Sequence, residues 1–557
     1  MLRMSARDSS MSCHLLSGRI LTVLMLITSV VFVCFILTVN CSISSDASGE
    51  TSGQCGDDLY WTYDTQTGAL TITGTDEMYD YLYSDERWGG NKIVSVSLPE
   101  GITHIGNYAF YGCTSLTSVE ISDSVTSIGN FAFYGCISLA SVEIPNPVRT
   151  IGDDAFEWCT ALKTVYLSDS VMTIGNKAFY GCNSLTFITV DESNTTYVSV
   201  NGVLIDKRNT ELVRYPAGKI DKSYNIPDSV TSVGDYSFEG CTSLTSVIFG
   251  DSVTTIGDNA FEWCTTLASI RIPDTVISIG GYAFYGCTSL TSLTLGDSVM
   301  IMGGYAFYGC ISLTSVDITD HVISIGDYAF HGCTSLTALT FGNSLISIGN
   351  DAFSECTSLT SLTVPGSVSS IGDRAFFGCS SLASIAVDVS NTVYESDNGV
   401  LIDRKNAELF QYPAGKTDKS YSIPGSVRII KEYAFRNNDN LESLVFSNGN
   451  GVSIHYGGLY DCISLKVIRI SDDTAVEFQS DSIYYTDEML HTIYVSGPDG
   501  TSVPSEALHG NVGIVYGEPP SDGTDMSLII YVVVAVVAIV AVAGVAILIM
   551  RKKNSDQ

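Results

Sequence analysis

The chain has 557 residues, with 60 acidic and 27 basic side chains and a formal net charge of −33 at pH 7. So acidic a chain is a poor electrostatic partner for nucleic acid or an anionic membrane surface, and we exclude both. We interpret the charge as a means of keeping a long molecule soluble. Divalent-cation binding at the Asp-rich turns is the alternative, although no EF-hand-like or RTX-like ligand spacing supports it.

Residues 1–41 are predicted to be a signal peptide or an N-terminal signal anchor. Three arginines precede an apolar run, residues 20–39, that carries no charge. The run is long for a signal-peptide core and long enough to span a bilayer. No clean small-residue cleavage site follows it, so cleavage and retention both remain open.

Residues 42–100 are predicted to form a linker and a β-rich N-terminal cap. The stretch LYWTYDTQTGALTITGT indicates two strands joined by a short turn. We expect Trp61, Leu70 and Ile72 to cover the open end of the repeats, because an uncapped terminal coil would expose apolar side chains and unpaired backbone.

Residues 101–495 are predicted to form a leucine-rich repeat solenoid with a period of 23 residues. The skeleton is I-G-x-x-A-F-x-x-C-x-S-L-x-x-L-x-L-x-x-S-V, as in residues 279–299. A fixed period in the twenties indicates stacked coils rather than a single globular core. In each coil we expect a short parallel strand, a turn, a second apolar wall, and a short helical or 3₁₀ turn that carries the Ala-Phe pair.

A single coil cannot bury its apolar side chains, whereas stacked coils can. We expect Leu290, Leu293 and Leu295 to point inward from one strand, and Ala306 and Phe307 to fill the interior from the following turn. Neighbouring strands then pair in parallel, about 4.8 Å apart. At about 0.8 kcal/mol per buried CH₂, the rows of Leu, Ile and Phe supply most of the stacking energy.

Two inserts interrupt the period, near 191–223 and 388–420. Each holds the segment N-G-V-L-I-D, four turn residues, and then E-L followed by a Y-P-A-G-K corner. We predict a β-hairpin in each insert that widens one coil without ending the stack. The copies begin at Asn201 and Asn398, 197 residues apart, which indicates internal duplication.

Twelve of the 16 cysteines occur at one phase of the repeat. We predict a buried structural ladder in which each reduced thiol acts as a small apolar group with a weak donor. Cross-linking between neighbouring coils in an oxidising compartment is the alternative. Cys41 and Cys55 lie outside the repeats and are better disulfide candidates. The ladder comprises Cys113, Cys136, Cys159, Cys182, Cys241, Cys264, Cys287, Cys310, Cys333, Cys356, Cys379 and Cys462.

Aromatic side chains flank the Ala-Phe pair in many coils and form the candidate binding surface. Because Ala and Phe take the buried positions, we expect these rings to be at least partly exposed. Tyrosine suits contacts with proteins or glycans. The alternative is that the rings of adjacent coils merely stack on one another. The candidates are Tyr108, Tyr111, Tyr134, Tyr180, Tyr282, Tyr285, Tyr305, Tyr308, Tyr328, Trp158 and Trp263.

Other surface positions give weaker signals. The outward strand positions are mostly small, as at Thr291 and Ser292, and lack the aromatic and Arg anchors that dominate interface energies. We interpret them as a solvated face. Asn194 begins an Asn-Thr-Thr sequon and is a possible N-glycosylation site.

The sequence carries no catalytic or metal-binding motif. It lacks G-x-S-x-G, H-E-x-x-H and a P-loop, and no Cys/His cluster has zinc spacing. The seven histidines show no recurring spacing with Cys, Asp or Glu, and His331 merely replaces the tyrosine of the repeat. We therefore predict that the protein is not an enzyme and binds no cofactor or metal.

Residues 496–526 are predicted to be a C-terminal cap remnant followed by a Pro/Gly/Asp-rich stalk. Residues 527–550 form an apolar run before a basic triplet, which is typical of a transmembrane helix with a stop-transfer flank; residues 551–557 would be a cytoplasmic tail. By the positive-inside rule, the repeat domain is extracellular. The chain would cross the cell membrane once, or twice if the N-terminal segment is retained.

The motif I-G-x-x-A-F-x-x-C-x-S-L-x-x-[VL]-x-[LIV], as in residues 128–144, resembles the repeat of the BspA-like (treponemal-type) leucine-rich repeat cell-surface proteins. The WTYD…GALTITGT and NGVLID…YPAGK segments also resemble that family, and the likeness covers about residues 55–495. It implies a cell-surface protein, often an adhesin that binds host or matrix proteins or other cells. Fold does not by itself fix function.

Together these features favour a membrane-anchored cell-surface protein. It would mediate adhesion, or bind an extracellular protein or glycan, through the solenoid surface. A passive envelope or spacer protein is the alternative. A receptor ectodomain that acts through a separate signalling partner ranks third.

Overall fold

The computed structural model describes residues 51–83, 88, 92–447, 451–487, 489, 491–498 and 501–519. All its described strands belong to one of the chain's two compact units. The predicted N-terminal signal segment and the predicted C-terminal membrane helix and tail lie outside the described residues. Within the described part of the chain, no helix is long and apolar enough to cross a membrane.

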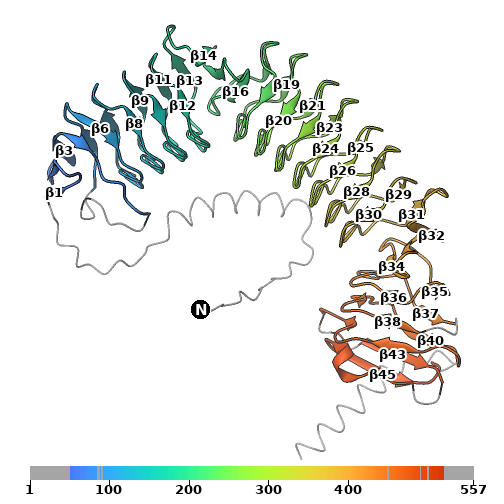
Figure 1. Ribbon diagram of the computed structural model, residues 1–557. Coiled ribbons are helices and arrows are strands. Elements are labelled where there is room, and N and C mark those ends of the chain that lie inside the picture. Colours follow the sequence, from blue (N-terminus) through green and yellow to red (C-terminus); the bar gives the residue numbers. More distant parts are fainter. Residues whose placement is uncertain are drawn as a thin grey trace, which may run out of the picture. The chain divides into compact units, whose positions relative to one another are not determined.

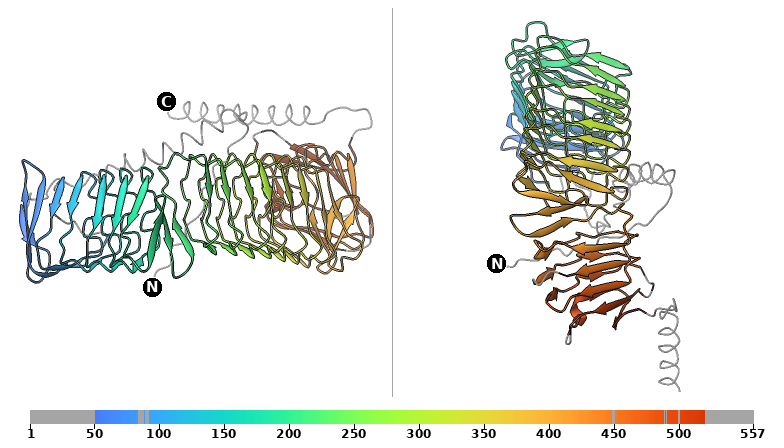
Figure 2. Two further views of the ribbon diagram at one scale, coloured as in Figure 1. Left: turned by 90° about the horizontal axis from the view of Figure 1, so that it is seen from above. Right: turned by 90° about the vertical axis from the view of Figure 1, so that its right-hand side faces the viewer.

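The described unit is a parallel β-solenoid, as the period predicts, with coils of 23 residues stacked one on the next (Figure 1). The registers show the period directly, because Ser141 pairs with Thr164 and Thr164 with Phe187. Most coils contribute two strands, one to each of two ladders, and the strands of each ladder run side by side along the stack (Figure 2).

The first ladder contains the strands that carry the S-L or S-V pattern, whose middle residue points inward. Its strands are β5 (Ser95–Ser97), β7 (Ser118–Glu120), β9 (Ser141–Ile144), β11 (Thr164–Leu167), β13 (Phe187–Val190), β17 (Ser223–Asn225), β19 (Ser246–Ile248), β21 (Ser269–Arg271), β23 (Ser292–Thr294), β25 (Ser315–Asp317), β27 (Ala338–Thr340), β29 (Ser361–Val364), β31 (Ser384–Val387), β35 (Ser420–Ile423), β37 (Ser443–Phe446), β40 (Val467–Ile470), β43 (His491–Ser496) and β45 (Val512–Tyr516).

The second ladder consists mostly of two-residue strands around the Ile of I-G. Its strands are β4 (Asp76–Glu77), β6 (Ile102–Ile105), β8 (Ser127–Ile128), β10 (Thr150–Ile151), β12 (Thr173–Ile174), β18 (Ser232–Val233), β20 (Thr255–Ile256), β22 (Ser278–Ile279), β24 (Ile301–Met302), β26 (Ser324–Ile325), β28 (Ser347–Ile348), β30 (Ser370–Ile371), β36 (Ile429–Ile430), β38 (Val452–Ile454) and β41 (Val476–Phe478). Near the C-terminal end a short third ladder joins β39 (Leu459–Tyr460), β42 (Ile483–Tyr484) and β44 (Leu508–His509).

The core follows the predicted pattern of inward side chains. Leu290, Ala306 and Phe307 are fully buried. The phenylalanines of successive coils stack face to face, as in the pair Phe261 and Phe284, whose ring centroids lie 4.9 Å apart with planes 2° from parallel. Each coil therefore gains most of its apolar contact from its neighbours, as repeat proteins require.

The Ala-Phe segment differs from its prediction, because it is not helical. It is a chain of tight turns. The helix whose bounds the structure gives, the 3₁₀ turn η2 (Ser505–Ala507), lies far from it in the sequence. The backbone amides of the turn alternate: one donates to the next coil, and the following one donates within the turn. The N–H of Phe284 donates to the carbonyl of Ala306, whereas the N–H of Tyr285 donates back to Tyr282. A helix would direct all these amides along its own axis and leave the next coil without donors.

The N-terminal end of the described unit is an antiparallel meander. It contains β1 (Ser52–Gln54), β2 (Leu59–Asp64) and β3 (Ala69–Gly74), and β3 then pairs in parallel with β5. Trp61, Leu70 and Ile72 are buried there. This sheet covers the strand edge of the first coil.

Each insert forms three antiparallel strands, one more than the predicted hairpin. The first insert contains β14 (Tyr197–Val200), β15 (Val203–Asp206) and β16 (Glu211–Arg214); the second contains β32 (Tyr394–Asp397), β33 (Val400–Asp403) and β34 (Glu408–Gln411). Both ladders stop before each insert, at β12 and β13 and again at β30 and β31. The second ladder resumes when β16 pairs with β18 and β34 with β36, and the first resumes when β17 pairs with β19 and β35 with β37.

A tyrosine hydroxyl from the insert closes each broken ladder. The hydroxyl oxygen of Tyr197 accepts the N–H of Ile174 at 3.1 Å, and that of Tyr394 accepts the N–H of Ile371 at 2.8 Å. Both tyrosines are buried. A backbone donor that has lost its strand partner is thus satisfied by a side chain, which avoids the penalty of a buried unpaired amide.

Candidate functional site

The tight turn around Ala-Phe holds its aromatic residues in an unusual backbone conformation. Tyr282, Tyr305 and Tyr328 have φ of 56°, 59° and 56°, in the left-handed region. Trp158 and Trp263 are also left-handed, at the position before Cys where most coils have Gly. Non-glycine residues adopt this region rarely. Here it turns alternate amides toward the next coil, so the inter-coil hydrogen bonds hold the rings in place.

The tyrosines of neighbouring coils form two columns of stacked rings. Tyr282 and Tyr305 have centroids 4.5 Å apart with planes 3° from parallel, and Tyr305 and Tyr328 lie at 4.7 Å. In the second column Tyr285 and Tyr308 lie at 4.9 Å, and Tyr308 continues onto the imidazole of His331 at 4.6 Å. We call Tyr282, Tyr285, Tyr305, Tyr308 and Tyr328 the tyrosine surface.

The predicted aromatic candidates all retain some exposure. Tyr282 and Trp263 are the most open, with 38% and 44% of their surface exposed. The half-buried ones are Tyr108, Tyr111, Tyr134, Tyr180, Tyr285, Tyr305, Tyr308, Tyr328 and Trp158.

The candidates divide into three groups along the stack. Tyr108, Tyr111 and Tyr134 form a short stacked group near the N-terminal end, where Tyr111 and Tyr134 lie 4.8 Å apart. Trp158 meets Tyr180 edge to face beside the first insert, at 5.7 Å. Trp263 meets Tyr285 in the same way at 5.3 Å and extends the tyrosine surface by one coil.

The outward threonines of the first ladder are occupied by structural hydrogen bonds. The hydroxyl of Thr291 donates to the carbonyl of Ala268 at 3.0 Å, and that of Thr337 donates to Thr314 at 3.1 Å. Each hydroxyl thereby ties its coil to the preceding one. This accounts for the small polar residues on that face without a ligand.

The Asp and Asn residues of the turns act in the same manner. Asp153 Oδ1 accepts the N–H of Asn176 at 2.8 Å, and Asp320 Oδ1 accepts the N–H of Asn343 at 2.8 Å. Across the described residues, no group of three or more His, Cys, Asp or Glu side chains could hold a metal ion. The turn carboxylates and amides thus act as caps for the next coil.

The cysteine ladder is a column of hydrogen-bonded thiols. Eleven of its twelve members are buried, from Cys136 to Cys462, whereas Cys113 at the N-terminal end is half-buried. In each regular coil the Sγ donates to a phenylalanine carbonyl one coil earlier; Cys287 does so to Phe261 at 3.2 Å. Burial raises the pKa of the Cys333 and Cys379 thiols to about 12. Such thiols are poor nucleophiles and poor metal ligands.

Cys55, one of the two predicted disulfide candidates, is buried with its thiol reduced. Burial raises the pKa of this thiol to about 12. The other candidate, Cys41, lies outside the described residues.

Asn194 is a correction to the sequence interpretation, because its side chain is 1% exposed. Its amide donates to the carbonyls of Ser168 and Val171 at 2.8 and 3.0 Å. Its Oδ1 accepts the N–H groups of Thr196 and Tyr197. The folded chain has no room for a glycan on this nitrogen, so the sequon serves the turn.

The sequence reasoning missed a buried ion pair beside the first insert. Arg214 and Glu239 are 4% and 5% exposed, and Arg214 Nη2 lies 3.1 Å from Glu239 Oε2. The carboxylate also accepts the N–H of Gly181 at 3.2 Å. Charged residues are almost never fully buried unless they are paired. Two departures from the repeat were the available signals. The first insert has Arg214 where the second has Gln411, and Glu239 stands where the coil of Cys287 has a tyrosine.

A parallel solenoid of 23-residue coils, with a leucine-rich first strand and an Ala-Phe turn, defines a leucine-rich repeat protein. The BspA type leucine rich repeat region, in six copies, matches residues 84–200, 219–320, 300–414 and 406–514. The chain belongs to this family.

The chain is also similar to three solved bacterial structures. A leucine-rich repeat protein from Eubacterium ventriosum is 28% identical, with a TM-score of 0.54, over 62% of this chain and 98% of that one. A leucine rich cell surface protein from Faecalibacterium prausnitzii is 26% identical, with a TM-score of 0.47, over 58% and 96%. A leucine-rich repeat protein from Bacteroides ovatus is 25% identical, with a TM-score of 0.39, over 75% and 94%. No curated protein matches the chain.

Proposed function

We propose that this protein is displayed on the cell surface and binds an extracellular protein or glycan through the tyrosine surface. The observation that carries the proposal is the double column of partly exposed rings, in which each ring is held by its neighbours at 4.5–4.9 Å. Rings fixed before binding lose little side-chain entropy on binding, which is where preorganised surfaces gain affinity.

The proposal includes attachment to the membrane through residues 527–550. The length and hydropathy of that run support a spanning helix, and the basic residues that follow it support an extracellular repeat domain. The name of the Faecalibacterium relative, a cell surface protein, is in line with this placement. Protease treatment of intact cells should then remove an epitope tag inserted after Gly517 and spare one at Gln557. The opposite pattern would contradict it.

Adhesion by a quadruple variant tests the tyrosine surface. Replacing Tyr282, Tyr285, Tyr305 and Tyr308 with Ser should abolish adhesion of cells that display the protein to matrix or to other cells. A matched control replaces Ile277, Ile301 and Ile346 with Ser, since these side chains are 49%, 51% and 48% exposed in nearby coils outside the tyrosine surface. The control should adhere as the unmodified protein does.

A passive envelope or spacer protein is the second candidate, and one observation favours it. Because Tyr282, Tyr305 and Tyr328 stack so closely, their rings also stabilise the coils that carry them. A spacer would need the tyrosines for stability alone. The quadruple variant would then unfold at a lower temperature while the adhesion of folded protein stayed unchanged.

A further inference from the structure

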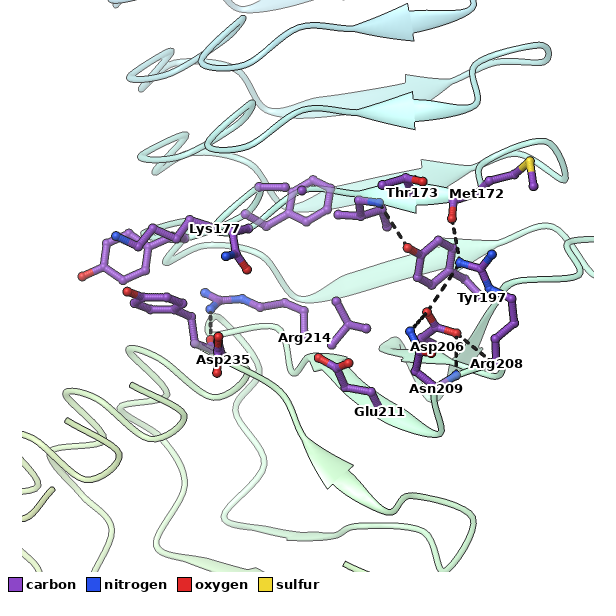
Figure 3. A pocket seen from close by; sticks show the side chains of 18 residues that line it. Met172, Thr173, Lys177, Tyr197, Asp206, Arg208, Asn209, Glu211, Arg214 and Asp235 are labelled. Atoms are coloured by element: carbon purple, nitrogen blue, oxygen red, sulfur yellow. Dashed lines mark hydrogen bonds and ion pairs between the residues drawn. The ribbon is translucent and has the colours of Figure 1, made fainter. Parts of the chain in front are cut away.

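A cavity of about 270 Å³ lies at the first insert, where the repeat is broken (Figure 3). One wall is the coil that carries β12, including Lys177 and Phe179. The other walls come from the three strands of the insert and from Asp235 and Tyr236 in the next coil. The cavity is separate from the tyrosine surface, so a ligand bound in it would be independent of the adhesive function.

At the break, some backbone N–H groups have no acceptor, although the equivalent N–H groups inside a regular run all have one. In the coil of Tyr282, three alternate amides donate to the next coil, at 2.9, 2.7 and 2.9 Å. The equivalent amides before the insert belong to Lys177, Phe179 and Gly181. The N–H of Gly181 reaches Glu239, but those of Lys177 and Phe179 have no acceptor among the described residues. Alternate amides of such a turn face one way and form an anion-binding concavity.

Arg214 adds a buried guanidinium to the same cavity. Its Nη1 donates to the carbonyl of Tyr236 at 2.6 Å and its Nη2 to Glu239 at 3.1 Å, but its Nε is buried without a partner. Figure 3 shows Arg214 between Lys177 on one side and Asp206 and Arg208 on the other. The Nζ of Lys177 lies 4.8 Å from the centre of the Tyr236 ring, at the same end.

The chain already shows a carboxylate bound by this kind of donor set. Glu239 takes the third amide of the turn and one nitrogen of Arg214, both with Oε2. The two remaining amides and the buried Nε of Arg214 have no acceptor among the described residues. The Lys177 ammonium, which is hydrogen-bonded to Tyr236, adds a positive charge at the same end. A buried donor without an acceptor costs free energy, so these groups favour an anionic acceptor from outside the chain.

Three carboxylates also line the cavity: Asp206, Glu211 and Asp235. Asp206 accepts hydrogen bonds from Arg208 and Asn209, and Asp235 Oδ1 accepts the N–H of Asp258, whereas Glu211 has no hydrogen-bond partner among the described residues. A simple anion would be repelled by Glu211, whereas a ligand with hydroxyl or ammonium groups would donate to it. We infer that the cavity binds a small carboxylate whose far end carries hydroxyl or ammonium donors, as in a uronic acid or an amino acid.

The second insert provides an internal comparison, because it fills the corresponding space. Phe410 stands where the first insert has Val213, and its ring packs edge to face on Tyr394 at 6.2 Å. Lys431 stands where the first has Gly234; its Nζ lies 4.0 Å from the Phe410 ring centre and 2.8 Å from Asp373 Oδ1. Gln411 replaces Arg214. The amides of Arg374 and Phe376 before the second insert also have no acceptor among the described residues, so the open cavity and Arg214, rather than the unpaired amides, distinguish the first insert.

This comparison supplies a variant that is compatible with the fold. Val213→Phe introduces the side chain that the second insert accommodates, and should close the cavity against Tyr197. Arg214→Gln introduces the residue of the second insert and removes the buried cation. Arg271→Gln is the matched control, because Arg271 is exposed on β21, outside the cavity. Circular dichroism checks that each variant is folded.

Titration calorimetry on the full-length protein tests the proposal with glucuronate, glutamate, glucose and acetate. We expect glucuronate or glutamate to bind, and which of them binds identifies the donors at the far end. Glucose, which lacks the carboxylate, and acetate, which lacks the donors, should bind at least tenfold more weakly. Val213→Phe and Arg214→Gln should each weaken binding at least tenfold, and Arg271→Gln should leave it unchanged.

Three results would overturn the inference. Neither glucuronate nor glutamate binds the folded protein; glucose or acetate binds as tightly as they do; or folded Val213→Phe retains full affinity. If Arg214→Gln does not fold without its buried ion pair, Val213→Phe alone decides the matter.

Discussion

The thiol of Cys287 donates a hydrogen bond to the carbonyl oxygen of Phe261, 26 residues earlier, over an Sγ···O distance of 3.2 Å. The same carbonyl accepts the N–H of Cys264 within its own coil, also at 3.2 Å. One backbone oxygen therefore joins two successive coils through two cysteines. Serine would add a stronger donor but a smaller side chain, and alanine would add no donor at all, which explains the choice of cysteine at this phase.

The first prediction concerns the reactivity of these thiols. Because burial raises the pKa of Cys333 to about 12, only on the order of one thiol in 10,000 is ionised at pH 8. The eleven buried ladder cysteines should not react with an aromatic disulfide reagent at pH 8 in the native protein. They should all react after denaturation. Half-buried Cys113 is the internal reference, and rapid native modification of Cys287 would contradict the ladder.

The second prediction concerns the hydroxyl that closes the broken ladder. Tyr394→Phe removes the acceptor of the Ile371 N–H and leaves a buried donor unpaired, so we expect a loss of about 1–3 kcal/mol in the free energy of unfolding. Denaturant unfolding measures it. Tyr282→Phe is the control, since that ring is 38% exposed. Equal effects of the two substitutions would show that the hydroxyl of Tyr394 is not structural.

The third prediction is a pH dependence from Glu157, which is 8% exposed. Burial, reinforced by the neighbouring Asp154, raises its pKa to about 9 from an ordinary value of 4.5. The folded state thus holds a proton that the unfolded chain releases above pH 4.5. The contribution of Glu157 to stability is therefore greatest below pH 4.5 and declines as pH rises toward 9.

Glu157→Gln removes that dependence, because the amide carries no titrating proton. The variant should melt a few degrees higher than the unmodified protein at pH 8 and no higher at pH 4. Thermal unfolding followed by circular dichroism at the two pH values measures the difference. A variant that is destabilised equally at both would show that the carboxyl is needed in its charged form.

The fourth prediction is that Asn194 remains unmodified in cells that glycosylate proteins. Its side-chain amide donates both hydrogens, to the carbonyls of Ser168 and Val171. Asn391 makes the two equivalent hydrogen bonds in the second insert, although it does not begin a sequon. Intact-mass and peptide mass spectrometry of the secreted repeat region check the site. Asn194→Asp should lower stability by about 1–3 kcal/mol, since it exchanges a buried donor for a charge.

The repeat could be predicted from sequence because its signal is global. Leu290, Phe307 and Cys287 recur at one spacing, and only stacked coils bury such a pattern. The Ala-Phe turn could not be predicted, because the left-handed backbone of Tyr282 is imposed by inter-coil hydrogen bonds rather than by local propensity. Tertiary contacts of this kind override the preference of single residues.

The candidate sites divide in the same way. Exposure of the tyrosines followed from elimination, since Ala and Phe already take the buried positions. The cavity did not, because it depends on Val213 and Gly234 being small where the second insert has Phe410 and Lys431. A sequence pattern can show that two segments are copies of each other. A cavity between them can be recognised only in the structure, because it depends on how the side chains of several elements pack together.

The inserts also decide how the stack would respond to load. Within a run, β18 to β30 are joined by continuous parallel ladders. At the first insert, β12 reaches the next run mainly through the Tyr197 hydroxyl and the side chains of Arg208 and Glu239. Isolated backbone hydrogen bonds, such as that from the N–H of Ile188 to the carbonyl of Gly202, also cross there. Shearing a backbone ladder requires many hydrogen bonds to break at once, whereas the side-chain hydrogen bonds at an insert can break one at a time. Under tension, the solenoid would therefore separate first at the inserts, and it would lengthen in steps before any run of regular coils unfolds.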